Sequence, residues 1–322
     1  MGTQSTSTRS NVLGIKSILG TESLSREQIT TILDCADHLG QLQKAGKPFP
    51  HSLLDKTVIL LFFEPSTRTR GSFELAAKRL KGDTLVLTKE MSSAEKGETL
   101  LDTAKNIEAM NPDILVLRHP SAGSPYLLSQ RLNVPVINAG DGFHEHPTQA
   151  LLDMMTIRQF KQDLNGLRVL ILGDIAHSRV ARSDIYALKT LGAKVSICGP
   201  PTLLPPKAEK MGVEVFYDLD EAVKDQDVVI CLRIQFERLN PGQSPSRGEY
   251  SKFYGMTSRR LKLAKPDVLV MHPGPVNRGV ELSPDVADGK HSVILNQVAN
   301  GVLVRMALLH LLTGGSQLGG PK

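Results

Sequence analysis

The stretch FFEPSTRTRGSF, residues 62–73, decides how this chain is interpreted. It follows the apolar run TVILLFF, residues 57–63, which is rich in β-forming residues, as a buried parallel strand requires. After it, Phe73, Ala76, Ala77 and Leu80 recur at helical spacing and stop before Gly82. The hydroxyls and guanidiniums of residues 66–70 are therefore expected where a strand gives way to the N-terminus of a helix.

This junction suits an anion. The first turn of a helix exposes unpaired N–H groups and the positive end of the helix dipole, which together favour negative charge. Ser66, Thr67, Arg68 and Thr69 would add hydroxyl and guanidinium donors at the same place. The alternative is that Ser66 or Thr67 is an ordinary N-cap and that the arginines are merely solvated. This interpretation is weaker, because five hydroxyl or guanidinium residues follow one another directly after the expected strand. A Walker A loop is excluded because the chain contains no G-x-x-x-x-G-K-[ST] pattern.

Strand and helix patterns alternate on both sides of the junction. Alternation of this kind predicts an α/β fold with parallel sheets covered on both faces. The chain turns polar around residues 162–166, so we expect two domains, residues 1–160 and 161–296, each a mostly parallel sheet flanked by helices. A cleft between them, at the carboxyl ends of the strands, would hold the active site. The expected strands, with a helix between most successive pairs, are residues 57–63, 83–87, 113–117, 135–140, 168–173, 194–198, 213–216, 228–232 and 267–273; the last helix is expected at about 297–312.

Composition narrows the class of protein. The 322 residues carry a formal net charge of +5 without a basic cluster, and no Trp and 4% aromatics argue against base-stacking surfaces, so we expect no nucleic acid partner. Three distant cysteines fit neither a disulfide framework nor a zinc site, which favours a reducing, cytoplasmic location. The N-terminus lacks a secretory pattern, and no uninterrupted run of about 18 apolar residues predicts a membrane span.

Three further stretches carry polar residues at places where strands end or helices begin. They are HPTQ at residues 146–149, RIQFER at 233–238 and HPGP at 272–275; Arg118 also ends an apolar strand, in VLRHP. Taken alone, each of these stretches also has an explanation that involves no function. Arg118 could simply reach solvent, His146 could be only a helix-start residue, and Arg233 with Arg238 could pair with Glu237 on the surface. The HPGP stretch could be a plain loop after a strand.

Together with STRTR, these stretches resemble the carbamoyltransferases, from about residue 13 to 312, and within them the enzymes that act on aspartate. Such enzymes transfer a carbamoyl group from carbamoyl phosphate to an amine, using fixed donors around the developing negative charge rather than a metal or a cofactor. The resemblance implies that Ser66, Thr67, Arg68 and Thr69 hold the phosphate. It also implies that Thr69, Arg118 and His146 face the carbonyl oxygen and that Gln149 recognises the carbamoyl amide. The HPGP turn, with Gly274 and Pro275, would accept hydrogen bonds through its carbonyls.

The second substrate needs cations for two carboxylates. Arg179, in GDIAHSR, and Arg233 with Gln235 each follow a strand of the second domain, and guanidiniums can grip carboxylates bidentately. The LILGDIAHSR stretch lacks G-x-G-x-x-G, so a dinucleotide site is discounted. The chain also lacks the SMG and HCLP motifs of the ornithine enzymes, which makes aspartate the expected substrate. Gly274 stands where some relatives have leucine.

The stretch SSAEKGETL, residues 92–100, could be a solvated loop whose lysine has no special role. By resemblance, Ser92 (or the adjacent Ser93) and Lys96 reach into the active site of a neighbouring subunit, and Lys96 joins Arg68, Thr69, Arg118 and His146 as a catalytic residue. A shared site implies a homotrimer. The last helix, about residues 297–315, would fold back on the first domain. A regulatory chain or a dihydroorotase-like partner in a larger assembly is left open.

The expected reaction gives N-carbamoyl-L-aspartate and phosphate, in de novo synthesis of the pyrimidine nucleotide UMP. A transcarbamoylase for another amine is the nearest rival, and substrate preference would distinguish it. A non-catalytic scaffold is a rival of another class; it predicts tight phosphate binding without turnover. A basic nucleic-acid-binding module is the weakest rival and predicts retention on DNA that falls with salt.

Overall fold

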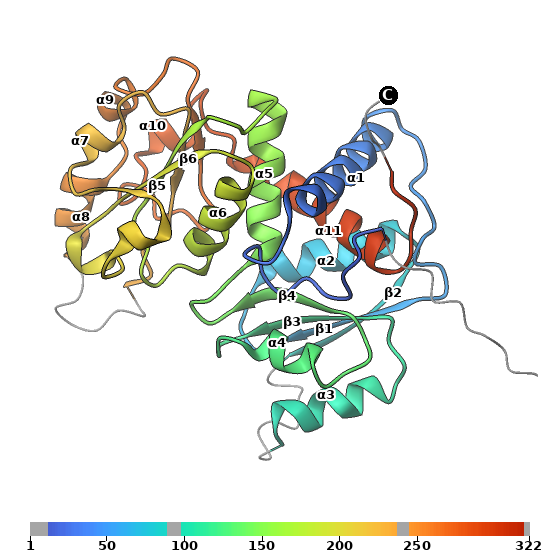
Figure 1. Cartoon of the computed structure of the whole chain (residues 1–322). Helices are drawn as coiled ribbons and strands as arrows, with labels where there is room; N and C mark the ends of the chain where they lie inside the picture. The colour runs from blue at the N-terminus through green and yellow to red at the C-terminus, as the bar shows by residue number, and fades with distance from the viewer. Residues whose placement is uncertain (1–11, 89–97, 237–244, 319–322) are drawn as a thin grey trace, which may run out of the picture.

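A computed structural model describes residues 12–88, 98–236 and 245–318 of the chain. Within them the chain forms two parallel sheets, of four and five strands, in the orders β2-β1-β3-β4 and β7-β6-β5-β8-β9. All paired strands among the described residues run parallel, as strands joined by helical crossovers can. The two-domain α/β architecture predicted from the sequence is confirmed (Figure 1).

The first sheet region follows the predicted alternation closely. β1 is buried from Val58 to Phe62, and α2 starts at Thr67 after a short turn, so the polar stretch does lie at a strand-to-helix junction. Helix α1 begins at a capping box formed by Ser25 and Gln28. The elements are α1 (Arg26–Lys44), β1 (Thr57–Phe62), α2 (Thr67–Arg79), β2 (Asp83–Thr88), α3 (Leu100–Glu108), β3 (Ile114–His119), α4 (Ser124–Ser129), β4 (Val136–Asp141) and α5 (Pro147–Lys161).

The second sheet region departs from the prediction in one place. Instead of a helix after β6, the chain forms two short 3-10 turns, η3 (Pro201–Leu203) and η4 (Ala208–Met211). Prolines at 200, 201, 205 and 206 remove the N–H donors that an α-helix would need there. The other elements are β5 (Arg168–Leu172), α6 (Arg179–Thr190), β6 (Lys194–Cys198), β7 (Glu214–Phe216), α7 (Leu219–Ala222), β8 (Val228–Cys231), α8 (Arg247–Tyr254), α9 (Ser258–Leu261), β9 (Leu269–Met271), α10 (Pro284–Ala287) and α11 (Ile294–Leu312).

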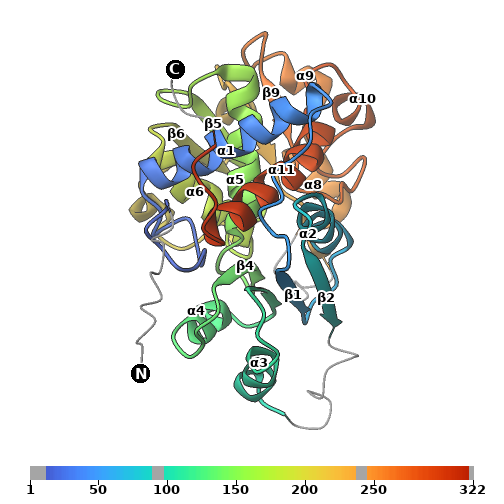
Figure 2. The same cartoon turned by 90° about the vertical axis from the view of Figure 1, so that its right-hand side faces the viewer.

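Helices α5 and α11 lie between the two sheet regions, as two perpendicular views show (Figures 1 and 2). α11 packs against α1, α2 and α5, and reaches β9 of the second sheet. It is long and apolar enough, by length and composition, to cross a membrane, but 67% of its most apolar window is buried inside the fold. Gln297, Asn300, Arg305 and His310 interrupt its apolar run and are themselves buried. α11 is thus placed as a core helix that joins the two regions.

Candidate active site

A cavity of about 670 Å³ opens between the two sheet regions, near the carboxyl ends of their strands. Its first wall consists of cavity residues between 65 and 152, its second wall of cavity residues between 178 and 275, and its floor of residues 297–305 on α11. Twelve predicted site residues line it: Ser66, Thr67, Arg68, Thr69, Arg118, His146, Gln149, Arg179, Arg233, Gln235, Gly274 and Pro275. Ser92 and Lys96, and also Glu237 and Arg238, lie outside the described residues.

The N-terminus of α2 faces this cavity. Ser66 is the N-cap, and its hydroxyl accepts a hydrogen bond from the Thr69 N–H at 3.3 Å. The first turn contains no acidic residue, so nothing on the helix itself neutralises its positive end. Thr69 is buried, whereas Arg68 is exposed to the cavity. The junction therefore offers backbone donors, hydroxyls and a cation at one place.

Arg68 and Arg233 bring two positive charges together from opposite walls. Partial burial, and then the charge of Arg233, lower the pKa of Arg68. Like charges held close in this way repel each other, and an anion between them would relieve the repulsion. The cavity is thus electrostatically suited to a ligand with negative charge.

Glu64 is a site residue that the sequence interpretation missed. Its Oε2 lies 3.4 Å from Arg118 Nε and 2.8 Å from Arg179 Nη2. One carboxylate therefore joins an arginine at the end of β3 to an arginine at the start of α6, so it links the two walls. The signal was present in the quoted stretch, where a carboxylate follows directly on an apolar strand, but its partners are distant in sequence.

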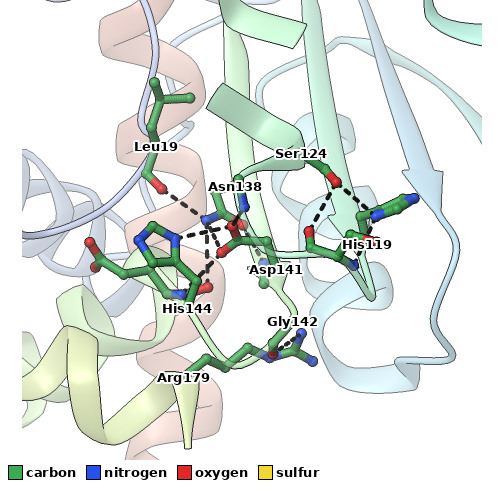
Figure 3. Close-up of polar contacts among 12 residues, drawn as sticks. Leu19, His119, Ser124, Asn138, Asp141, Gly142, His144 and Arg179 are labelled. Atoms are coloured by element: carbon green, nitrogen blue, oxygen red, sulfur yellow. Dashed lines mark hydrogen bonds and ion pairs between the residues drawn. The ribbon is translucent and has the colours of Figure 1, made fainter. Parts of the chain in front are cut away.

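Arg179 is positioned by the loop between β4 and α5 as well as by Glu64. Its Nη1 donates to the Gly142 carbonyl at 3.3 Å (Figure 3). That loop is held by Asp141, whose Oδ1 accepts from the Asn138 side chain at 2.8 Å and from the Glu145 N–H at 3.0 Å (Figure 3). The aspartate thus shapes a turn whose backbone carbonyl receives the Arg179 guanidinium.

His146 precedes α5 and is buried against several cations. The backbone N–H of His146 donates to Ser183 Oγ at 2.8 Å, and that hydroxyl in turn donates to Glu145 Oε2 at 2.7 Å. Burial, and then the charges of Arg118, Arg179 and Arg305, lower the pKa of the imidazole well below its usual value. His146 is therefore neutral near pH 7, and one ring nitrogen carries a proton that it can donate.

The turn after β9 forms part of the second wall. Gly274 has a φ of +67°, and a Cβ built on it would lie 3.2 Å from Arg68 Cζ. Glycine suits this position because it tolerates the left-handed conformation and the close approach of the guanidinium. The Gly274 N–H donates to His272 Nδ1 at 2.8 Å, which fixes the tautomer of His272 with its proton on Nε2.

Arg305, on the floor, was also missed. Its side chain is buried, donates to the Gly301 carbonyl at 3.0 Å and to Thr148 Oγ1 at 3.2 Å, and stacks on Phe73 at 5.2 Å. In the sequence it is one cation in an apolar helix, with no local pattern to mark it. Among the described residues, no group of three or more His, Cys, Asp or Glu side chains is arranged to hold a metal ion.

Two family models match the chain in succession. Residues 16–159 match the carbamoyl-phosphate-binding domain of aspartate/ornithine carbamoyltransferases, and residues 165–312 match the aspartate/ornithine-binding domain of the same family. The chain belongs to the aspartate/ornithine carbamoyltransferase family. The resemblance inferred from STRTR, HPTQ, RIQFER and HPGP is confirmed.

Relatives of this family cover nearly the whole chain. The aspartate carbamoyltransferase catalytic subunit of Syntrophotalea carbinolica is 57% identical over 303 residues, 94% of this chain and 97% of its own length. That of Syntrophobacter fumaroxidans is also 57% identical, over 92% of this chain and 97% of its own length.

Solved structures agree on the fold. Aspartate transcarbamoylase from Trypanosoma cruzi, in complex with carbamoyl phosphate and aspartate, gives a TM-score of 0.83 at 30% identity, and covers 96% of this chain and 98% of its own. Ornithine carbamoyltransferase from Pyrococcus furiosus gives 0.84 at 33% identity, over 94% and 98%. Backbone similarity therefore does not separate the two amine substrates, and the choice between them depends on the residues of the second wall.

Proposed function

We propose that this protein transfers the carbamoyl group of carbamoyl phosphate to L-aspartate, giving N-carbamoyl-L-aspartate and phosphate in pyrimidine synthesis. The observation that carries the proposal is the cavity in which the hydroxyl and guanidinium groups at the start of α2 face Arg233 and Gln235 across the gap. Relatives at 52–57% identity are named aspartate carbamoyltransferase catalytic subunits, which supports aspartate over ornithine.

The first wall supplies the chemistry in this proposal. Ser66, Thr67, Arg68 and Thr69 bind the phosphate, and the aspartate amine attacks the carbonyl carbon. Negative charge then develops on the carbonyl oxygen, where Thr69, Arg118 and neutral His146 donate hydrogen bonds. The bond from the carbon to the bridging oxygen breaks, phosphate leaves, and it accepts the proton that the amine releases. No side chain needs to act as a nucleophile.

The second wall holds the amine substrate. Arg179 and Arg233, with Gln235, bind the two carboxylates of aspartate, since guanidinium groups offer paired donors to such groups. Although Arg179 already pairs with Glu64 and Gly142, a guanidinium has five N–H donors, so some remain for a ligand. The carbonyls of the turn at Gly274 and Pro275 accept from the amide and amine N–H groups. Closure of the two walls would exclude water from the reaction.

The proposal extends to organisation and assembly. Residues 1–160, together with the returning helix at about 297–315, form the carbamoyl-phosphate domain, and residues 161–296 form the aspartate domain. The protein works in the cytoplasm as a homotrimer in which Ser92 and Lys96 of one subunit complete the site of the next.

The shared site can be tested by mixing two inactive variants. Trimers of Arg68→Ala and of Lys96→Ala, dissociated and reassociated together, should regain part of the wild-type activity, because some sites then inherit neither lesion. Each variant dissociated and reassociated alone is the control. No recovery, once subunit exchange has been demonstrated, would contradict the shared loop.

The reaction itself is tested by substrate choice. Purified protein is given carbamoyl phosphate with either L-aspartate or L-ornithine, and the ureido product is measured. Product with aspartate alone is expected. Product with ornithine alone would overturn the assignment of the second wall, and phosphate binding without product from either amine would favour the scaffold alternative.

A further inference from the structure

A buried polar network lies directly behind Gln149, where α5, α6 and α11 meet. Asp153, one turn along α5 from Gln149, has a fully buried side chain. Its Oδ1 accepts from Gln149 Nε2 at 3.1 Å and from Gln297 Nε2 at 2.7 Å. A single carboxylate therefore holds one amide on the first wall and another on the floor of the cavity.

Asp184 of α6 contacts the same carboxylate. It is also fully buried, and neither of its oxygens accepts a hydrogen bond from an N–H or O–H group of any described residue. Two adjacent buried carboxyl groups cannot both be ionised without strong repulsion. Burial, and then the charge of Asp153, raise the pKa of Asp184 well above its usual range, whereas burial raises the pKa of Asp153 only to about 7, so Asp184 is the partner that keeps the proton. One proton is thus shared by the pair, and Asp184 donates it to Asp153.

Charge balance agrees with this assignment. Among the described residues that face the pair from α5, α6 and α11, Arg305 is the cation that acts on Asp153. One ionised carboxylate balances that guanidinium, whereas two would leave an excess negative charge in a place closed to solvent. The neutral state of Asp184 is therefore the state that burial favours.

The network fixes which way two amides point. An ionised carboxylate only accepts hydrogen bonds, so Gln149 and Gln297 both turn their NH₂ groups toward Asp153. Their carbonyl oxygens consequently face away from it. Gln297 Oε1 accepts from the His272 N–H at 2.9 Å and thereby holds the end of β9 before the turn at Gly274. Gln149 lines the cavity, where the same polarity makes its Oε1 an acceptor for a ligand N–H.

We propose that Asp153 and Asp184, sharing one proton, form a positioning pair that sets the Gln149 carbonyl toward the carbamoyl NH₂ group and, through Gln297, anchors the turn of the second wall. The inference rests on the proposed function, because it takes carbamoyl phosphate as the ligand of Gln149. Neither aspartate touches the reacting atoms, so both act through Gln149 and Gln297.

The central test compares two amide substitutions. Asp153→Asn places an NH₂ group where two donors and an acid now converge, so it should lower kcat/KM for carbamoyl phosphate about a hundredfold, the cost of misplacing a contact group by about 1 Å. Asp184→Asn keeps a neutral donor toward Asp153 and should retain activity within about threefold at pH 7. Wild type should show an alkaline decline in kcat/KM as the shared proton dissociates, and Asp184→Asn should lack it.

An infrared measurement tests the shared proton without any assay of activity. Wild type should show the C=O stretch of a buried carboxylic acid at pH 7, and Asp184→Asn should lack that band. Absence of the band in wild type, or an alkaline limb unchanged in Asp184→Asn, would overturn the inference. Equal activity of Asp153→Asn and wild type would also overturn it. If Asp153→Asn fails to fold, the band and the alkaline limb decide. Wild type without carbamoyl transfer would instead refute the proposed function, whatever the band shows.

Discussion

The two walls of the cavity differ in how their functional groups are held. On the first wall, Thr69, His146 and Gln149 are buried and backed by side chains such as Ser183 and Asp153. On the second wall, Arg179 is buried and paired with Glu64, but Arg233 and Gln235 are half-buried, and the turn at Gly274 and Pro275 presents backbone. Thr69, His146 and Gln149 are therefore held rigidly against developing charge, whereas Arg233 and Gln235 have more room to adjust to a bound dicarboxylate. Substitutions on the first wall should mainly lower kcat, and those on the second should mainly raise KM for aspartate.

The difference is expected to be largest at Arg68. Arg68→Ala removes a guanidinium from the phosphate end of the cavity and should lower kcat about a hundredfold to a thousandfold. Steady-state kinetics with both substrates saturating measure the effect. Arg70→Ala is the matched control, since Arg70 lies on the same helical turn but does not line the cavity, and it should stay within about threefold. Equal losses in both variants would contradict the assignment of Arg68.

A substitution at Glu64 tests the link between the walls. Glu64→Gln removes the charge that Arg118 and Arg179 share, so both walls should lose alignment and kcat/KM should fall about tenfold to a hundredfold for both substrates. Glu221→Gln, which alters an exposed pair with Lys224, serves as the control and should have no measurable effect. A change confined to one substrate would show that Glu64 serves one wall only.

On the second wall, Arg233→Lys keeps the charge but loses the planar pair of donors. KM for aspartate should rise about tenfold, whereas KM for carbamoyl phosphate should change by less than about threefold. Initial rates over a range of each substrate measure both constants. Arg278→Lys, in an exposed pair with Asp288, is the control and should match wild type. An equal rise in both Michaelis constants would mean that the two walls do not divide the substrates.

The smallest effect concerns stability and pH. Burial and the charges of Arg68 and Arg233 lower the pKa of His272 to about 3 from its usual 6.5. Between those pH values the unfolded chain takes up a proton that the folded protein does not. The stability that His272 contributes is thus complete above about pH 6.5 and declines as the pH falls, by up to about 1.4 kcal/mol per pH unit.

His272→Gln should therefore show a shallower dependence of unfolding free energy on pH than wild type. Urea titrations at pH 7.5, 6.5 and 5.5 measure it for both proteins. His291→Gln is the control, because His291 is half-buried and does not line the cavity between the two arginines. Identical slopes for wild type and His272→Gln would show that His272 does not stay neutral on folding.

Sequence reasoning located the first wall because its signals are local. The strand at 57–62 and the helix from 67 are marked by their own apolar periodicity, and the donors between them are consecutive. The same reasoning wrongly predicted a helix after β6, because regular alternation was expected there although four prolines prevent an α-helix.

The residues that escaped prediction act through partners distant in sequence. Glu64 pairs with arginines on β3 and α6, and Arg305 reaches Thr148 on another helix. The contact between Asp153 and Asp184 depends on how α5 packs against α6. In each case the pairing is created by tertiary packing, so the local sequence around each residue does not reveal its partner.

The most direct test of the divided cavity is a two-substrate initial-rate grid for wild type, Arg68→Ala and Arg233→Lys, measured side by side. Formation of N-carbamoyl-aspartate is followed while carbamoyl phosphate and aspartate are varied independently. The account predicts that Arg68→Ala lowers the maximal rate, whereas Arg233→Lys leaves that rate nearly intact and shifts the dependence on aspartate alone. The same kinetic defect in both variants would contradict the assignment of one substrate to each wall.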